Sequence, residues 1–96
     1  KQHPTFLFAE NDAIAIGALR ALQEADIAVP DQISIVGFND SKVAKYVYPP
    51  LSSIRVDTRE MGRTGVSLLL DRIAYPRKIS KKISLSTEWI KRASTK

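Results

Sequence analysis

The chain has 96 residues, no cysteine and a net charge of +5. This length limits it to one domain, and the lack of cysteine excludes disulfides, thiolate metal sites and thiol nucleophiles. The positive charge lies mainly in residues 41–96, but only residues 77–82 form a basic cluster, which is typical of a solvated loop rather than a nucleic-acid surface.

Targeting signals are missing from the sequence. No segment is apolar enough and long enough to span a membrane. The chain opens at Lys1 with neither an initiator methionine nor a signal-peptide pattern, so we expect a piece of a longer protein. The absence of cysteine fits a reducing compartment, and we predict a cytoplasmic location.

Two apolar runs, at residues 5–9 and 33–38, predict strands, and residues 12–25 between them predict a helix. Strand, helix, strand is typical of a parallel pair, because antiparallel neighbours need only a tight turn. The second run is almost continuously apolar, as expected for a strand covered on both faces.

Each apolar run leads into an Asn-Asp pair, Asn11-Asp12 after the first and Asn39-Asp40 after the second. Ligands of open parallel sheets bind just past the carboxyl ends of the strands. An asparagine side chain carries both a donor and an acceptor, which suits a hydroxyl-rich neutral ligand. Asn11 is also a good helix N-cap, and each asparagine alone is readily explained as a cap or turn residue.

The first helix is apolar on most sides, with Ile16 as an anomaly. At 3.6 residues per turn, Ile16 falls beside Arg20 and Gln23 on the polar side. We therefore predict that Ile16 is exposed and marks the edge of a subunit contact.

After the second strand, residues 41–46 predict a short helix capped by Ser41, and residues 51–56 an extended segment. Asp57 and Glu60 have the spacing of a capping box, so a second helix is expected to run from there to Ala74. This helix is amphipathic and must cover something. Its apolar stripe consists of Met61, Gly62, Gly65, Val66, Leu69, Leu70 and Ile73.

The last part of the chain predicts one more strand and a tail. Residues 82–90 alternate at period two, which is typical of a half-buried strand. Residues 92–96 are short and polar and are expected to form the tail.

The residues that catalysis and metal binding need are scarce. His3 is the only histidine, and no glycine-rich phosphate cradle is present. A shared metal at Asp12, Asp40 and Asp57 is the less favoured interpretation, because all three fit turn, cap or first-turn positions. We predict no catalytic residue, no metal and no cofactor, and hence no enzyme.

Four segments carry recognisable motifs in order. Residues 8–19 (FAENDAIAIGAL) fit the pattern NDxxAxGxxxA, and residues 29–40 (VPDQISIVGFND) resemble VPxDISxxGFDD. Residues 49–54 (PPLSSI) resemble PPLTTI, and residues 90–95 (IKRAST) resemble a terminal R-x-S-T. Together these segments resemble the lactose-repressor/galactose-repressor family of bacterial transcription regulators, over nearly the whole chain.

The resemblance implies an α/β fold, a parallel sheet with flanking helices, as part of a two-lobed, type I periplasmic-binding-protein-like domain. It implies that residues 1–53 are the βαβ portion of the second lobe and residues 54–58 a crossover between lobes. Residues 59–80 would be a helix and loop of the first lobe, and residues 81–96 the terminal strand and tail. The implied partners are a sugar or sugar-phosphate effector, a second copy in a homodimer, and operator DNA read by a headpiece outside this chain.

By the same resemblance, Asn11, Asn39, Val56 and Thr58 align with effector-binding positions. Asn39 stands where the family usually has aspartate. An amide does not repel an anionic ligand as a carboxylate does, so neutral and phosphorylated sugars are both admissible. Asp26 stands where the family often has glycine, and aspartate tolerates a left-handed backbone better than most residues.

Two other classes of protein stay open at this point. The first is a periplasmic sugar-binding protein of the same fold, which the sequence upstream of Lys1 would distinguish. The second is a signalling or phosphoryl-transfer domain that uses Asp12 and Asp40, for which the sequence offers no good lysine or metal partner.

Overall fold

The computed structural model describes residues 5–76 and 79–96, and the chain divides into two compact units. The first unit comprises Lys1–Arg55 and Glu88–Lys96, and the second comprises Val56–Thr87. The chain therefore passes between the units twice. No helix among the described residues is long and apolar enough to cross a membrane.

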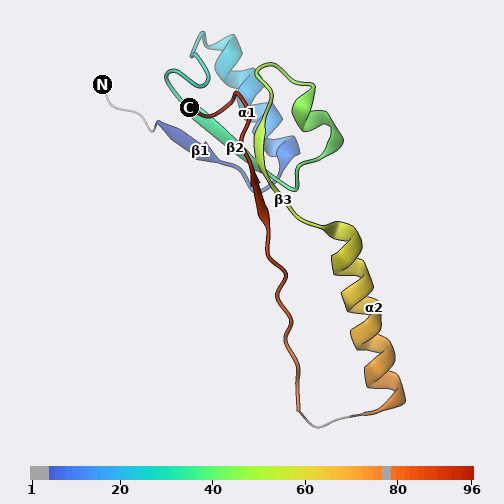
Figure 1. Ribbon diagram of the computed structural model, residues 1–96. Coiled ribbons are helices and arrows are strands. Elements are labelled where there is room, and N and C mark those ends of the chain that lie inside the picture. Colours follow the sequence, from blue (N-terminus) through green and yellow to red (C-terminus); the bar gives the residue numbers. More distant parts are fainter. Residues whose placement is uncertain (1–4, 77–78) are drawn as a thin grey trace. The chain divides into compact units, whose positions relative to one another are not determined.

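The first unit is an α/β layer in which one helix lies beside a sheet (Figure 1). The strands lie side by side in the order β1-β2-β3-β4. The elements of this unit are β1 (Phe6–Phe8), α1 (Asp12–Glu24), β2 (Ser34–Phe38), the 3₁₀ helix η1 (Lys42–Lys45), β3 (Ser52–Arg55) and β4 (Glu88–Ile90).

The pairing confirms the predicted parallel unit. Strands β1 and β2 are parallel, with Leu7 opposite Ile35, and β2 and β3 are parallel, with Gly37 opposite Ser53. Strand β4 runs antiparallel to β3. The carboxyl ends of β1, β2 and β3 therefore share one edge of the sheet, which is where Asn11 and Asn39 follow their strands.

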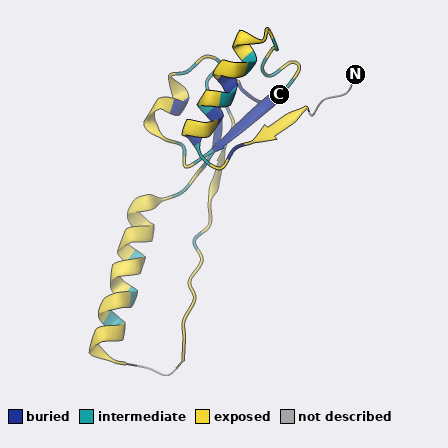
Figure 2. Cartoon of the chain, turned by 180° about the vertical axis from the view of Figure 1, so that it is seen from behind, coloured by how far each residue is buried: buried dark blue, intermediate teal, exposed yellow. Residues whose placement is uncertain are grey.

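The core of this unit lies between α1 and the sheet. Ala15 and Leu19 of α1 pack with Ile35 of β2 and with Leu51, and all four are buried. Figure 2 shows β2 dark blue over most of its length, in contrast to the yellow edge strand β1.

The prediction that Ile16 is an exposed residue was wrong. Ile16 is half-buried and packs against the core cluster. The prediction rested on the polar neighbours Arg20 and Gln23, but the acidic Asp12 is only 2% exposed. The buried face of α1 therefore passes through Asp12, Ala15 and Leu19, and Ile16 adjoins it. The exposed isoleucine of this helix is Ile14, at 51%.

The segment predicted to be a tail is part of the folded unit. Ser94 is fully buried and Thr95 is 8% exposed. The Ser94 hydroxyl donates to the Ile35 carbonyl at 2.6 Å and accepts from the Ser52 backbone N–H at 2.8 Å. Ser94 is buried because it satisfies backbone groups of two strands, a role that its polar character concealed in the sequence.

The second unit consists of helix α2 (Thr58–Ala74) and an extended segment. Asp57 caps α2 as predicted, accepting from the Glu60 backbone N–H at 2.9 Å. No residue of α2 is buried, and the large side chains of its apolar stripe are all at least half exposed.

Two further details of the sequence prediction were wrong. Residues 82–87 form no strand, and only Glu88–Ile90 pairs with β3. Ser41 occupies the N-cap position of η1, but its side chain makes no capping hydrogen bond. Its backbone N–H donates to the Asp12 carboxylate instead.

Candidate functional site

Asn11 and Asn39 follow neighbouring parallel strands at the edge where such sheets bind ligands. Asn11 is the N-cap of α1, with an extended backbone and a side-chain oxygen that accepts from the Ile14 N–H at 2.9 Å. Its oxygen is thus committed to the helix, and its NH₂ group makes no hydrogen bond to residues 5–76 or 79–96. The cap explanation considered for Asn11 is confirmed; it leaves the NH₂ group available to a ligand.

Asn39 has an unusual backbone and an uncommitted side chain. Its φ is 97°, and that of the following Asp40 is 51°, so two successive non-glycine residues are left-handed. The Asn39 side chain is exposed and makes no hydrogen bond within the described part of the chain. Such conformations cost of order 1–3 kcal/mol each and persist only where the surroundings enforce them.

Backbone hydrogen bonds hold residues 39–41, which we call the Asn39–Ser41 corner. The Asn39 N–H donates to the Ile54 carbonyl at 2.8 Å, and the Asp40 N–H donates to the Ser53 hydroxyl at 3.0 Å. The Ser41 N–H donates to Asp12 Oδ2 at 2.5 Å. All three backbone donors of the corner therefore have partners on other elements.

Asp12 is the buried centre of this arrangement. Its Oδ1 accepts a hydrogen bond from the Ser53 hydroxyl at 2.8 Å, while its Oδ2 accepts one from the backbone N–H of Ser41 in the corner. A Cβ on Gly37 would lie 2.1 Å from Asp12 Oδ1, so only glycine allows this close approach. Asp12 thus joins the start of α1 to β3 and to the corner.

Asp40 is held by two arginines. Arg92 Nη1 lies 2.7 Å from Asp40 Oδ1, and Arg55 Nη2 lies 2.9 Å from Oδ2. The Asp40 side chain is only 7% exposed. The hydrogen bond from Arg92 lowers the pKa of Asp40 below its ordinary value of 3.8, with a further lowering from Arg55, against the opposing effect of burial. Asp40 is therefore an ionised structural residue.

The other predicted site residues lie elsewhere in the structure. Val56 is half-buried and Thr58 is the exposed first residue of α2, both in the second unit. Their role towards an effector stays a prediction of the resemblance. The subunit contact at Ile16, which was inferred from the residue's place on the helix, also stays a prediction. Within the described residues, no cluster of histidine, cysteine, aspartate or glutamate has a geometry for a metal ion.

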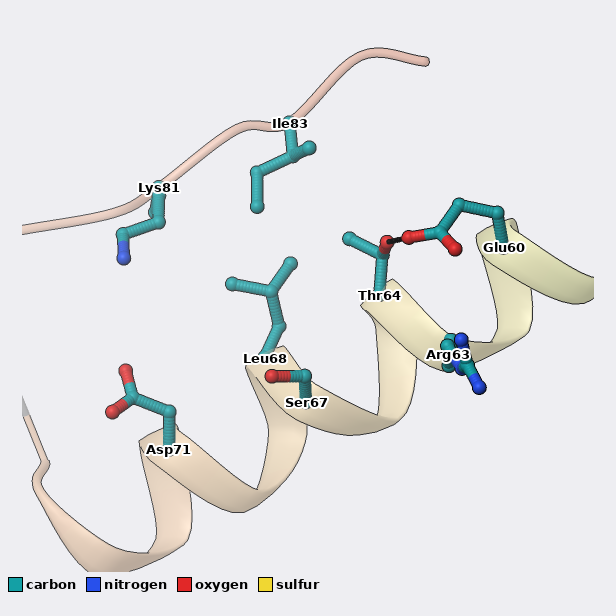
Figure 3. Close-up of a pocket in the computed structure, with 8 residues that line it drawn as sticks. All are labelled: Glu60, Arg63, Thr64, Ser67, Leu68, Asp71, Lys81 and Ile83. Carbon is teal, nitrogen blue, oxygen red and sulfur yellow. Dashed lines mark hydrogen bonds between the residues drawn. The ribbon is translucent and has the colours of Figure 1, made fainter.

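A groove of about 530 Å³ lies in the second unit, between α2 and the extended segment (Figure 3). Leu68 points from the helix towards Ile83, while Lys81 and Asp71 lie at one end and Glu60 lies at the other. The Thr64 hydroxyl donates to the Glu60 carboxylate at 3.3 Å. Charges of both signs line this groove, so its composition selects no ligand class.

The sequence predicted where the site lies, but not the side chains that hold its two aspartates in place. It assigned Asp12 and Asp40 to cap and turn roles and did not foresee the bonds from Ser53, Arg55 and Arg92 to these carboxylates. Those partners lie 15 to 52 residues away in the sequence. The R-x-S-T motif was a partial signal: its Arg92 binds Asp40, and its Ser94 binds the backbone of β2 and β3, whereas Ser53 and Arg55 lie outside the motif.

The family model "Periplasmic binding protein-like domain" matches residues 1–95, and the parallel sheet with its polar carboxyl edge agrees with that class of protein. The HTH-type transcriptional regulator GalR of Streptococcus thermophilus is 54% identical over 97% of the chain, which spans 28% of that protein. The chain belongs to the lactose-repressor/galactose-repressor family.

Solved structures agree with this assignment. A LacI-family regulator from Enterococcus faecalis V583 with bound ribose is 39% identical, with a TM-score of 0.87 over 99% of this chain and 36% of that one. The lac repressor dimer bound to operator and the anti-inducer ONPF is 34% identical, with a TM-score of 0.86 over 96% of this chain and 32% of that one. The chain thus spans about a third of these relatives.

Proposed function

We propose that this chain is the effector-sensing and dimerisation portion of a DNA-binding transcription regulator, a repressor of carbohydrate-utilisation genes. The observation that carries the proposal is the conformation of Asn39. Hydrogen bonds to other elements hold its backbone in the left-handed region, while its side-chain amide stays exposed. A strained residue with a free polar group at a ligand-binding edge is typical of a binding site.

The chemistry of the two asparagines suits a sugar. Asn39 offers a carbonyl and an NH₂ group, and Asn11 offers the NH₂ group that its capping role leaves free. Neither group carries charge, so neutral sugars and sugar phosphates are both accepted. The bound ribose in the related regulator from Enterococcus faecalis supports a sugar as the effector class.

The relatives favour a regulator over a periplasmic binding protein. The GalR relative is named as a transcription regulator, and the lac repressor relative is a dimer on its operator. We propose the same arrangement here: a cytoplasmic homodimer that binds DNA through a separate headpiece and has no catalytic role. Val56 and Thr58 are proposed as further effector-binding residues on the resemblance alone.

Operator release tests this function. The test uses the complete regulator of which, as we propose, this chain is a part. The fluorescence anisotropy of labelled operator DNA bound to it should change when the correct sugar is added. Asn39→Ala should shift the sugar response to concentrations at least about tenfold higher, equal to about 1.4 kcal/mol, because one paired amide is lost. Operator affinity without sugar should stay unchanged. A regulator whose DNA binding ignores every sugar in a broad panel would contradict the proposal.

A further inference from the structure

We propose that Arg92, near the carboxyl end of the chain, is a positioning residue that holds the Asn39–Ser41 corner in its ligand-binding form. This inference rests on the proposed function and extends it to a residue that contacts Asn39 only through Asp40. Its basis is the contact between Arg92 Nη1 and Asp40 Oδ1 at 2.7 Å, across 52 residues of sequence.

Arg92 is itself fixed at both ends. Its Nη1 also donates to the Leu51 carbonyl at 2.8 Å, and its backbone N–H donates to the Ser52 hydroxyl at 2.7 Å. The Arg92 side chain is 17% exposed. The guanidinium group is thus bound to Leu51, just before β3, and the backbone is bound to Ser52, the first residue of β3. These two attachments make Arg92 a rigid support.

Arg55, the second partner of Asp40, is a weaker support. Its side chain is half exposed, and its Nη1 also lies 3.6 Å from the Glu88 carboxylate. A solvent-exposed arginine shared between two carboxylates holds each less firmly. We therefore assign the positioning role to Arg92.

The position of the Asn39 amide depends on the conformation of Asp40. With its carboxylate bound by Arg92 and its N–H bound by Ser53, Asp40 is held in the left-handed region at a φ of 51°. Removing the carboxylate anchor allows residues 39 and 40 to relax towards an ordinary backbone. The Asn39 side chain then leaves the direction that a ligand requires.

The test is a double-mutant cycle in the complete regulator, with Arg92→Ala, Asn39→Ala and the double variant. Calorimetric titrations with ribose, galactose, lactose and cellobiose identify the tightest sugar, and its affinity for each variant is measured well below the melting temperature. Arg92→Ala is expected to weaken binding about tenfold alone and less than about twofold in the Asn39→Ala background, because both changes remove the same contact.

Lys91→Ala is the matched control. Lys91 lies next to Arg92 and donates to the Thr95 carbonyl, so its removal loosens the same segment and takes away the same charge without touching Asp40. Its sugar affinity should remain that of the wild type. Should Arg92→Ala fail to fold, Arg92→Lys replaces it in the cycle, since lysine keeps the charge but cannot reproduce the planar donor geometry.

The outcomes separate this inference from the proposed function. A loss of about tenfold in Asn39→Ala, with either no change in the arginine variant or additive losses in the double variant, would overturn the positioning role and leave the proposed function intact. Wild-type affinity in Asn39→Ala would overturn both. A lowered melting temperature with wild-type affinity in the arginine variant would reduce Arg92 to a purely structural residue.

Discussion

At the scale of single residues, the polar edge of the sheet is built from side chains that hold the backbone rather than from reactive groups. Asp12 and Asp40 are both committed to protein partners, one to hydroxyl and amide donors and one to arginines. This leaves the side chains of Asn39 and Ser41 as the exposed polar groups of the corner. The site is therefore suited to recognition and not to acid-base chemistry.

The Asp40–Arg92 ion pair predicts a pH-dependent stability. Because the pKa of Asp40 is lowered in the folded chain, its stabilising contribution is fully present above the unfolded value of 3.8 and is lost as pH falls below it. At pH 7, Asp40→Asn should lower the unfolding free energy by about 3 kcal/mol, typical of a broken, largely buried pair.

Urea unfolding of wild type and Asp40→Asn between pH 7 and pH 2 measures this difference. The gap between the two proteins should close as the pH drops below 3.8. Arg20→Ala is the control, because its pair with Glu24 is exposed and should contribute less than about 1 kcal/mol at any pH. A gap that stays constant down to pH 2 would rule out the ion pair as its source.

At the scale of elements, helix α1 has an inner face that builds the core and an outer face that is free for association. Ile16 adjoins the inner face, whereas Ile14 is exposed together with the small residues Ala13, Gly17 and Ala21. The predicted subunit contact near Ile16 is therefore best tested from the outer face.

We expect Ile14→Arg to dissociate the proposed homodimer of the complete regulator at low micromolar concentration, because a charge would enter a desolvated contact. Ile16→Arg should dissociate it too, but with a lower melting temperature, since this side chain also packs on the core. Light scattering gives the mass, with the exposed loop variant Asp31→Arg as control. A fully dimeric Ile14→Arg protein would place the interface away from α1.

The elements themselves were largely predictable from sequence, and their long-range connections were not. Apolar runs gave β1 and β2, and local caps at Asn11 and Asp57 located the starts of both helices, because these signals act within a few residues. Burial of Asp12 and Ser94 depends on partners 41 and 59 residues away. Hydrophobic periodicity and local caps do not contain that information, so the buried face of α1 and the burial of residues 94–95 were predicted wrongly.

At the scale of the whole molecule, helix α2 carries more apolar surface than the chain covers. Five of its six large apolar side chains are 51–67% exposed: Met61, Val66, Leu69, Leu70 and Ile73. Burying such a side chain fully contributes roughly 1.5–3 kcal/mol. The sum is comparable to the whole stability of a small domain, so this stripe is expected to associate with another surface.

We predict that the isolated 96-residue chain self-associates. Sedimentation velocity should show a mass that rises with concentration, and the double change Leu69→Lys and Leu70→Lys should abolish that rise. Replacing Thr64 and Ser67 by lysine serves as the control, because it adds the same two charges to the same helix off the stripe. A compact monomer at all concentrations would contradict the prediction.

The isolated chain should also lack specific DNA binding despite its net charge of +5. Specific readout requires side chains presented to base edges by an element that fits a groove, and the basic residues here are dispersed. Gel shifts with operator and scrambled DNA should show equal, weak and steeply salt-dependent binding. Nanomolar, sequence-dependent shifts at physiological salt would overturn this prediction.

The most direct test of the central claim, that this chain carries the effector site of a sugar-responsive regulator, is calorimetric titration of the complete protein and its Asn39→Asp variant. We predict that the wild type binds one sugar of a neutral and phosphorylated panel, and that Asn39→Asp changes the order of preference, with the largest loss for phosphorylated sugars because of charge repulsion. An unchanged affinity for every sugar would contradict the claim.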